Sequence, residues 1–205
     1  MKPIDKLMDC HHVKRWTLVG TTETSTVASH SFNVAMIALA IRKHMFNTAH
    51  IDKNVLCFHA LMHDVDEAET GDMPTPTKAA IRRAGVEPNA LFETQGQMPK
   101  PRPEYEVIIK LADLIENYIF IHEHGVGARA RSAVTEVEGR MRRAIAEAPS
   151  DASTAAGLVL DYIISRKSDT DEERKRLKED SERLREATRF SLDPGSHFLG
   201  REPCY

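Results

Sequence analysis

The most informative segment of the chain is an apolar run that ends in a histidine and an aspartate, Leu56-Cys57-Phe58-His59-Ala60-Leu61-Met62-His63-Asp64. Its apolar side chains predict a buried helix, which we place over residues 51–69. Burying an ionisable side chain costs several kcal/mol unless it is paired or coordinated. Two such side chains at the end of a buried helix therefore indicate a functional pair, and a divalent metal would offset the cost of burying them.

Two more candidate ligands lie in apolar helical patterns elsewhere in the chain, His30 and Asp113. Together with His63 and Asp64 they supply two imidazoles and two carboxylates, which suit a divalent transition metal that polarises phosphate or water. Each has an alternative role. His30 can accept amide hydrogen bonds at a helix N-terminus, and Asp113 can be a boundary carboxylate paired with a nearby Lys110 or Arg129.

His59 lies one helical turn before His63, so both side chains can face one site. The same spacing occurs in the zinc-binding pair of metalloproteases. Here Ala60 replaces the glutamate that follows the first histidine in that motif, which argues against a protease.

Composition limits the class of protein. The chain has 205 residues, of which 41% are hydrophobic and 29% charged, which is typical of a globular domain with a sizeable core. A net charge of −3 argues against a nucleic-acid polymer as partner, and no run approaches the ~20 apolar residues of a membrane span. Three scattered cysteines and an N-terminus without a signal-peptide pattern lead us to expect a cytoplasmic protein.

Helical periodicity dominates, so we predict an all-α fold. A cap at Ser29 or Ser31 is expected to start the helix that carries Phe32 and Val34, and Gly71, Pro74 and Pro76 are expected to delay the helix that follows residue 69. We predict one domain over residues 1–190 and a loose tail over 191–205. Helices are expected over 4–12, from 29 or 31 onward, 51–69, 78–84, 104–124, 128–148, 152–166 and 171–188, and a loop over 96–103. The helix over 171–188 is strongly charged, so we expect it to be exposed to solvent or, alternatively, to bind a partner.

The order of the four candidate ligands resembles the H…HD…D motif of the HD-domain metal-dependent phosphohydrolases. Within that superfamily, several strings resemble the bacterial 5′-deoxynucleotidases, and the resemblance covers roughly residues 10–125. The most specific string is Thr70-Gly71-Asp72-Met73-Pro74-Thr75-Pro76-Thr77-Lys78, and the others are Lys14-Arg15-Trp16, Val27-Ala28-Ser29-His30-Ser31, His63-Asp64-Val65-Asp66-Glu67 and Lys110-Leu111-Ala112-Asp113.

The resemblance implies an HD-domain helical bundle with one divalent transition metal, such as Co, Mn or Zn, between its helices. The implied metal ligands are His30, His63, Asp64 and Asp113. The resemblance also implies a deoxynucleotide substrate and a homo-oligomer. If the protein is encoded by a phage, its location would be the host cytoplasm.

The same resemblance implies roles around the metal. Arg15 would grip the phosphate, Trp16 would exclude a 2′-hydroxyl, and Asp72 would bind the sugar 3′-hydroxyl. Glu67 would assist proton transfer with the attacking water, next to Asp64. Plainer readings exist, because Arg15 and Trp16 can form a surface cation–π pair and Asp72 can merely shape the turn from Thr70 to Pro74.

Two departures from the family pattern affect the substrate. Ser29 replaces the usual acidic residue before the first ligand histidine, and the interval between Asp64 and Asp113 is compact. That interval resembles the short phage relatives that hydrolyse dATP, and a shorter cap would leave room for a longer phosphate chain. Basic residues near the interval would neutralise its charge, namely Lys78, Lys100, Arg102 and Lys110.

The sequence therefore predicts a hydrolase of 2′-deoxynucleoside 5′-phosphates with water attacking the α-phosphorus, and a monophosphate or a triphosphate substrate stays open. The alternatives are a non-catalytic nucleotide sensor and an HD-type phosphodiesterase for another nucleotide. The presence of Glu67 and Asp72 argues against the sensor, and the Thr70–Lys78 string argues against the other phosphodiesterases.

Overall fold

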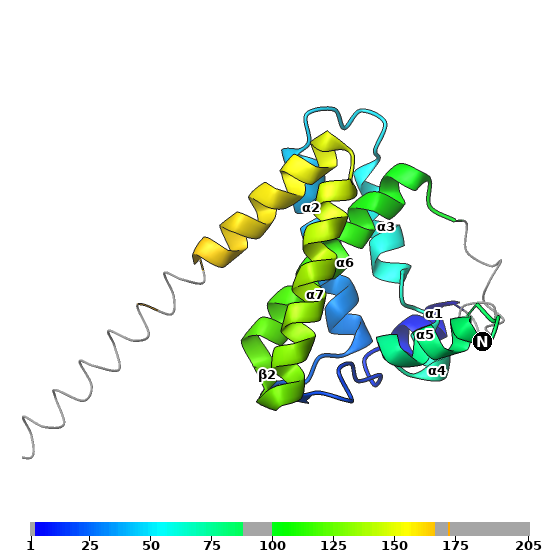
Figure 1. The fold of residues 1–205 in the computed structure, drawn as a ribbon. Coiled ribbons are helices and arrows are strands. Elements are labelled where there is room, and N and C mark those ends of the chain that lie inside the picture. The colour runs from blue at the N-terminus through cyan, green and yellow to red at the C-terminus, as the bar shows by residue number, and fades with distance from the viewer. Residues whose placement is uncertain (1–2, 88–99, 167–171, 173–205) are drawn as a thin grey trace, which may run out of the picture. The chain divides into compact units, whose positions relative to one another are not determined.

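The computed structural model describes residues 3–87, 100–166 and 172, and within these ranges the protein is almost entirely helical (Figure 1). By its contacts the chain divides into two units, Met1–Leu160 and Asp161–Tyr205. The elements of the first unit are α1 (Pro3–Asp9), β1 (Gly20–Thr21), α2 (Val27–His44), α3 (Lys53–Met62), α4 (Glu67–Thr70), α5 (Thr75–Arg83), α6 (Pro103–His124), β2 (Gly125–Val126) and α7 (Gly127–Glu147), followed by helical residues 150–160. Of the second unit, residues 161–166 are described as helical.

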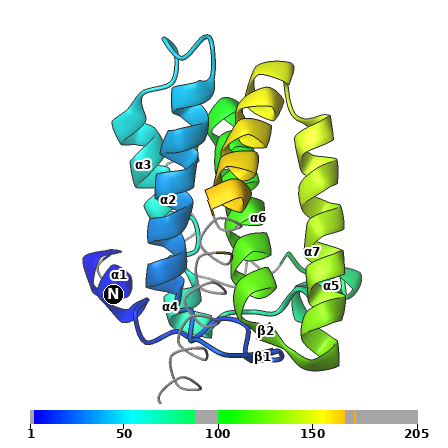
Figure 2. The ribbon, with the colours of Figure 1, turned by 90° about the vertical axis from the view of Figure 1, so that its left-hand side faces the viewer.

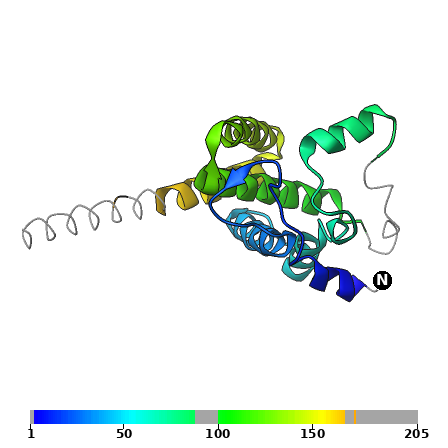
Figure 3. The ribbon, with the colours of Figure 1, turned by 90° about the horizontal axis from the view of Figure 1, so that it is seen from below.

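Helix α6 is the centre of the first unit. It packs against α2 on one side and α7 on the other, and α3 packs against α2 (Figures 2 and 3). The packed faces follow the apolar periodicity of the sequence, so burying them removes these side chains from water. Fully buried members of this core include Val34, Ile41, Leu56, Ile108, Leu111, Ile115 and Met141. The predicted all-α fold is confirmed.

Helix α2 begins earlier than the sequence predicted. Its N-cap is Thr26, whose side chain accepts a hydrogen bond from the Ser29 amide, while the Ser29 hydroxyl accepts one from the Thr26 amide. This reciprocal capping box satisfies two amides that the helix leaves open. The prediction of a cap at Ser29 or Ser31 was therefore wrong, because Ser29 is the third helical residue and Ser31 is buried.

The predicted helix over 51–69 is two helices. Asp52 caps α3, which ends at Met62, and a turn over residues 63–66 leads into α4. Carboxylates crowd the chain from Asp64 to Glu69, and negative charge is unfavourable at the C-terminus of a helix but favourable in a first turn. The break therefore places Glu67 in the first turn of α4 instead of the last turn of α3.

Smaller differences also have local causes. Helix α5 begins at Thr75 rather than Lys78, because Pro76 lies in its first turn, where the missing proline N–H is not needed. Helix α1 ends at Asp9 rather than residue 12. The ladder of β1 with β2 was not predicted. It pairs Gly20 with Val126 and Thr21 with Gly125, and so ties the segment before α2 to the turn between α6 and α7.

The other predicted helices agree with the structure to within a residue or two, namely 104–124 with α6, 128–148 with α7, and 152–166 with the helical residues 150–166. Most of the predicted loop over 96–103, almost all of the charged helix over 171–188 and the tail over 191–205 lie outside the described residues. The single domain over 1–190 stays a prediction. No helix among the described residues is long and apolar enough to span a membrane.

Candidate metal and substrate site

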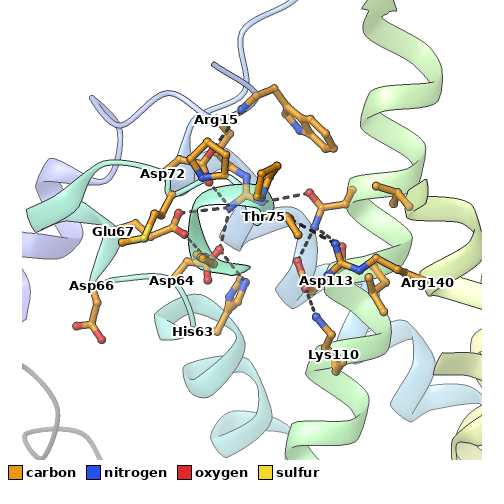
Figure 4. A pocket seen from close by; sticks show the side chains of 18 of the residues that line it. Arg15, His63, Asp64, Asp66, Glu67, Asp72, Thr75, Lys110, Asp113 and Arg140 are labelled. Atoms are coloured by element: carbon orange, nitrogen blue, oxygen red, sulfur yellow. Dashed lines mark hydrogen bonds and ion pairs between the residues drawn. The ribbon is translucent and has the colours of Figure 1, made fainter. Parts of the chain in front are cut away.

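Three of the predicted ligands converge. His30 from α2, His63 at the end of α3 and Asp113 from α6 each offer one ligand atom, and these atoms lie within 4.8 Å of one another. His30 is fully buried. Figure 4 shows His63 and Asp113 pointing into the same pocket from different helices.

The two imidazole rings are oriented by their Nδ1 atoms. His63 Nδ1 lies 2.7 Å from the main-chain oxygen of Ala60, and His30 Nδ1 lies 2.5 Å from Oε2 of Glu116. These acceptors keep a proton on Nδ1, so Nε2 is the atom that each ring offers to a metal. Both Nε2 atoms are buried and have no hydrogen-bond partner among the described residues. A divalent metal between them fits this donor set.

Asp64 borders the same cluster. Its Oδ2 lies 3.4 Å from Nε2 of His63 and 3.6 Å from Nε2 of His30. The same oxygen accepts a hydrogen bond of 2.8 Å from Nη1 of Arg15. Asp64 therefore lies between the candidate metal position and the guanidinium group, within reach of both.

The charges in the cluster favour a cation between the ligands. Burial and the charge of Arg15 lower the pKa of His30, but its interactions with Asp113 and Glu116 raise that pKa to about 9. Burial raises the pKa of Asp113, but His30 and the charge of Lys110 hold it well below its usual range. Asp113 is thus ionised at neutral pH, and its Oδ1 lies 3.4 Å from Nε2 of His30. Without a metal, His30 carries a second proton at that pH, and a metal bound at Nε2 would displace it.

Glu67 is buried beside the cluster without belonging to it. Its Oε1 accepts a hydrogen bond of 2.9 Å from Nζ of Lys78, and its Oε2 lies 3.5 Å from Nη1 of Arg15. Burial and the nearby charge of Asp64 raise the pKa of Glu67 to about 7, against the opposing charges of Lys78 and Arg15. A carboxyl group with that pKa can both accept and release a proton near neutral pH.

Arg15 joins the two sides of the pocket. Its Nη1 faces three carboxylates, at 2.8 Å from Asp64, 3.5 Å from Glu67 and 3.8 Å from Asp72. Its Nη2 donates a hydrogen bond of 3.1 Å to Asn117 on α6. The side chain is largely buried, so the alternative of an exposed cation–π pair with Trp16 does not fit the structure.

Trp16 and Asp72 meet at the pocket wall. Trp16 has a φ of 60°, a left-handed conformation that is uncommon for a bulky residue, and its amide donates a hydrogen bond of 3.3 Å to Oδ2 of Asp72. Its ring stacks on Phe120 of α6, with the ring centroids 6.3 Å apart. Asp72 therefore holds the backbone of Trp16 in place, in addition to lying in the turn after α4.

A cavity of about 1200 Å³ has walls from α3, α5, α6, α7 and the segment around Trp16, and His30 is not among the residues that line it. Of the side chains described above, it is lined by Arg15, Trp16, His63, Asp64, Glu67, Asp72, Asp113 and Asn117. Asp66 points away from the other labelled carboxylates, as Figure 4 shows. His59 lines the cavity but is not in the ligand cluster. Of the basic residues expected near a phosphate chain, Lys78, Lys100 and Lys110 line the cavity. Arg102 does not, and it donates to the main-chain oxygen of His50 and to the hydroxyl of Tyr105.

Sequence reasoning missed three residues near the site, of which two, Glu116 and Asn117, lie on α6. Glu116 is buried and holds His30, while Asn117 contacts both Arg15 and Asp113. Both lie three or four positions after Asp113 in an apolar helix, a spacing that places them beside it on the helix surface. Polar side chains at that spacing were the available signal. Arg140 of α7 was missed as well, and it lines the cavity and approaches Oγ1 of Thr75 at 3.5 Å.

Known proteins match this chain over most of its length. It is 30% identical to the dATP triphosphohydrolase of Salmonella phage PMBT28 over 159 residues, which are 72% of this chain and 79% of that protein. It is 27% identical to the dATP triphosphohydrolase of Cyanophage S-2L over 74% of this chain and 87% of that protein. The 5′-deoxynucleotidase PM0747 of Pasteurella multocida is 38% identical over 32% of this chain and 35% of that protein.

The fold and the family profile agree with these relatives. The solved structure of the Cyanophage S-2L HD phosphohydrolase bound to dA and one catalytic Zn²⁺ ion superposes with a TM-score of 0.65 and 24% identity, over 79% of this chain and 96% of that chain. The profile of the YfbR-like 5′-deoxynucleotidases matches residues 4–99. The chain therefore belongs to the HD-domain phosphohydrolases that include the 5′-deoxynucleotidases and the phage dATP triphosphohydrolases.

Proposed function

We propose that this protein hydrolyses 2′-deoxynucleoside 5′-triphosphates, with dATP as the first candidate, to the nucleoside and tripolyphosphate. The observation that carries the proposal is the extent of the match to the phage dATP triphosphohydrolases, which includes helices beyond residue 99. In the reaction the oxygen of water bonds to the α-phosphorus and the bond from that phosphorus to the 5′-oxygen breaks. The 5′-oxygen leaves with a proton.

In this proposal His30, His63, Asp64 and Asp113 hold one divalent transition metal. The bound metal would polarise the α-phosphate and lower the pKa of the attacking water. Two imidazoles and two carboxylates suit Zn²⁺, Mn²⁺ or Co²⁺, and the metal content of the purified protein decides among them.

Glu67 and Arg15 would act on the reacting groups. With a pKa of about 7, Glu67 can accept a proton from the attacking water. Arg15 directs Nη1 into the pocket, where a phosphate oxygen would replace part of its contact with the carboxylates. Asp64 would contribute to the reaction together with Glu67. Its Oδ2 lies between the ligand cluster and Arg15, so it would contact both the metal and the phosphate-binding side chain.

Trp16 and Asp72 would select the sugar. The strained backbone of Trp16 and its bond to Asp72 hold the indole ring as a fixed wall, which would clash with a 2′-hydroxyl. The Asp72 carboxylate is an acceptor for the 3′-hydroxyl. Loss of that hydrogen bond is worth ~1–3 kcal/mol, so 2′,3′-dideoxynucleotides should be poor substrates.

The size of the cavity and the basic side chains in its wall support a triphosphate substrate. Its volume of about 1200 Å³ exceeds that of an ordinary small-molecule pocket. Lys78, Lys110 and Arg140 reach it from α5, α6 and α7, and their charges offset the repulsion between a polyphosphate and the carboxylates of the site.

Analysis of the products tests the proposal. The pure protein is incubated with dATP, dAMP, ATP or 2′,3′-dideoxyATP and Co²⁺, Mn²⁺ or Zn²⁺, and the phosphate product is identified. We expect deoxyadenosine and tripolyphosphate from dATP, and no activity in the His63→Ala variant. Orthophosphate from dATP would indicate stepwise removal from the end of the chain and contradict attack at the α-phosphorus.

The second candidate is a 5′-deoxynucleotidase for deoxynucleoside monophosphates. The match of residues 4–99 to the YfbR-like 5′-deoxynucleotidases favours it. Hydrolysis of dAMP together with unreacted dATP would establish this activity and exclude the triphosphohydrolase. Assembly as a homo-oligomer stays a prediction, which the mass of the particle in solution tests.

A further inference from the structure

We propose that Asn117 is a positioning residue that couples the metal ligand Asp113 to the phosphate-binding Arg15. The proposal rests on the proposed function for its substrate, dATP. Asn117 lies one helical turn after Asp113 on α6 and lines the cavity. A single side chain therefore contacts the candidate metal centre and the candidate phosphate clamp at the same time.

The first contact fixes Asp113. Nδ2 of Asn117 donates hydrogen bonds of 2.6 Å to Oδ1 of Asp113 and of 2.9 Å to its main-chain oxygen. The same Oδ1 lies 3.4 Å from Nε2 of His30, so it is the oxygen that faces the ligand cluster. Oδ2 of Asp113 lies 3.1 Å from Nζ of Lys110. The Lys110 side chain is half exposed, so water weakens this ion pair.

The second contact fixes Arg15. Oδ1 of Asn117 accepts a hydrogen bond of 3.1 Å from Nη2 of Arg15. Because this acceptor is neutral and holds Nη2, it orients the guanidinium plane without adding another negative charge. Nη1 is then the edge that faces the carboxylates and the pocket.

The chemistry of its neighbours settles which way the amide points. The two oxygens of Asp113 are acceptors only, and a guanidinium group is a donor only. The amide nitrogen must therefore face Asp113 and the amide oxygen must face Arg15. Asparagine satisfies both neighbours at once, whereas aspartate has no donor for Asp113 and leucine has neither group.

The coupling has a physical use because Arg15 comes from an irregular segment, while Asn117 lies on the central helix. A long arginine side chain loses conformational freedom when it binds a phosphate, and holding it beforehand lowers that cost. Sharing one turn of α6 also keeps the guanidinium group at a fixed position relative to Asp113. We therefore expect Asn117 to act on substrate binding through Arg15 and on metal binding through Asp113.

Two variants of Asn117 remove these contacts in different ways. Asn117→Leu keeps the size of the side chain but removes all three of its hydrogen bonds. Asn117→Ala leaves space for water. The matched control is Asn54→Ala, at an exposed position on α3. Circular dichroism establishes that each variant is folded before the Co²⁺ affinity of the metal-free protein, and the kcat and KM for dATP, are measured.

We expect Asn117→Leu to weaken Co²⁺ binding roughly 10–100-fold, as is usual for loss of a partner to a metal ligand. The KM for dATP should rise roughly tenfold, as for loss of one hydrogen bond to a charged group. In an Arg15→Ala background, the same change should still weaken Co²⁺ binding but should no longer raise KM. Asn54→Ala should match the parent protein in every measurement.

Three results would overturn the coupling. The first is Co²⁺ affinity or KM within twofold of the parent, and the second is a rise in KM that persists in full without Arg15. The third is loss of the helical signal in both Asn117 variants, which would make Asn117 a structural residue. A parent protein that leaves dATP intact would instead defeat the proposed function. The Co²⁺ measurements, and KM values measured with dAMP, would then still test Asn117.

Discussion

Glu67 lies in the wall of the cavity, between two positively charged side chains and close to one negatively charged one. Its two oxygens contact Lys78 and Arg15, and Asp64 lies close enough to raise its pKa. The four proposed ligands do not include it, and three of them, His30, His63 and Asp113, converge without any contact to Glu67. Glu67 is therefore available for proton transfer.

We predict that Glu67→Gln keeps the metal and lowers kcat roughly 10²–10⁴-fold, because an amide of the same shape cannot accept the proton. Metal content and steady-state kinetics measure the two effects. Asp66→Asn is the matched control, since Asp66 points away from the other labelled carboxylates, and it should retain most of the rate. Loss of the metal in Glu67→Gln would show instead that Glu67 is a ligand.

The pH dependence of kcat/KM should follow the ionisation of the Glu67 carboxyl group. Below its pKa of about 7, Glu67 is neutral and cannot accept a proton, so kcat/KM should rise as the pH increases through that value. The positive charge of Lys78 lowers this pKa. Lys78→Met should therefore raise the pKa and move the rising limb to higher pH.

Profiles of kcat/KM against pH at saturating metal measure this shift. Arg83→Met is the control, because it removes a positive charge from an exposed position on the same helix. It should leave the pH at which kcat/KM rises unchanged. A limb that moves to lower pH in Lys78→Met would contradict the assignment to Glu67.

At the scale of elements, the junction of α6 and α7 positions both sides of the site. Helix α6 carries Asp113 and Asn117, and α7 carries Arg140. Next to the junction, β2 pairs with β1, which follows Arg15 by a few residues and so holds that segment in place. The chain turns at Gly125. A Cβ atom there would lie 2.4 Å from the main-chain oxygen of Ile121 and 2.9 Å from Cβ of Ala130.

We predict that Gly125→Ala lowers the free energy of unfolding by ~1–3 kcal/mol, because a main-chain oxygen in a packed turn cannot move away cheaply. Urea unfolding followed by circular dichroism measures the change. Gly139→Ala is the control on α7, where the nearest atom is 3.6 Å away and belongs to the flexible side chain of Arg143. It should be neutral or stabilising by up to ~1 kcal/mol. Equal stability of the two variants would refute the steric argument.

At the scale of the whole molecule, the ligand cluster joins helices that are distant in sequence. His30 comes from α2, His63 from the end of α3 and Asp113 from α6, and these are the helices that form the core. Unfolding separates the ligands. A metal that binds them together therefore stabilises the folded state over the unfolded chain.

Removing the metal with a chelator should lower the unfolding temperature by roughly 10 °C. Free metal at about a thousand times its Kd contributes ~4 kcal/mol, and each kcal/mol shifts the unfolding temperature by ~2–4 °C at this chain length. Differential scanning calorimetry with and without chelator measures the shift. His63→Ala should not respond to the chelator, whereas His59→Ala should respond as the parent does. The same response in both variants would place the metal elsewhere.

Most of the helices and the identities of the candidate ligands could be predicted from the amino-acid sequence. Apolar periodicity is a local property, so it predicted α6 and α7 closely, and burying a histidine or an aspartate is costly enough to mark His63 and Asp113. It did not determine where α3 ends. The periodicity continues past Met62 and conceals the break, which the local crowding of carboxylates favours. The partners of those carboxylates, Arg15, Lys6 and Lys78, come from other parts of the fold.

Which side chains lie in contact could not be predicted from the sequence, because it depends on how the helices pack. The contacts of Glu116 with His30, and of Asn117 with Arg15, join residues that are distant in sequence. No local pattern encodes such pairs, because a distance between remote residues is set by how α2, α6 and the segment around Arg15 pack. The sequence supplied the chemical groups, and the packing of α6 between α2 and α7 brought them within hydrogen-bonding distance.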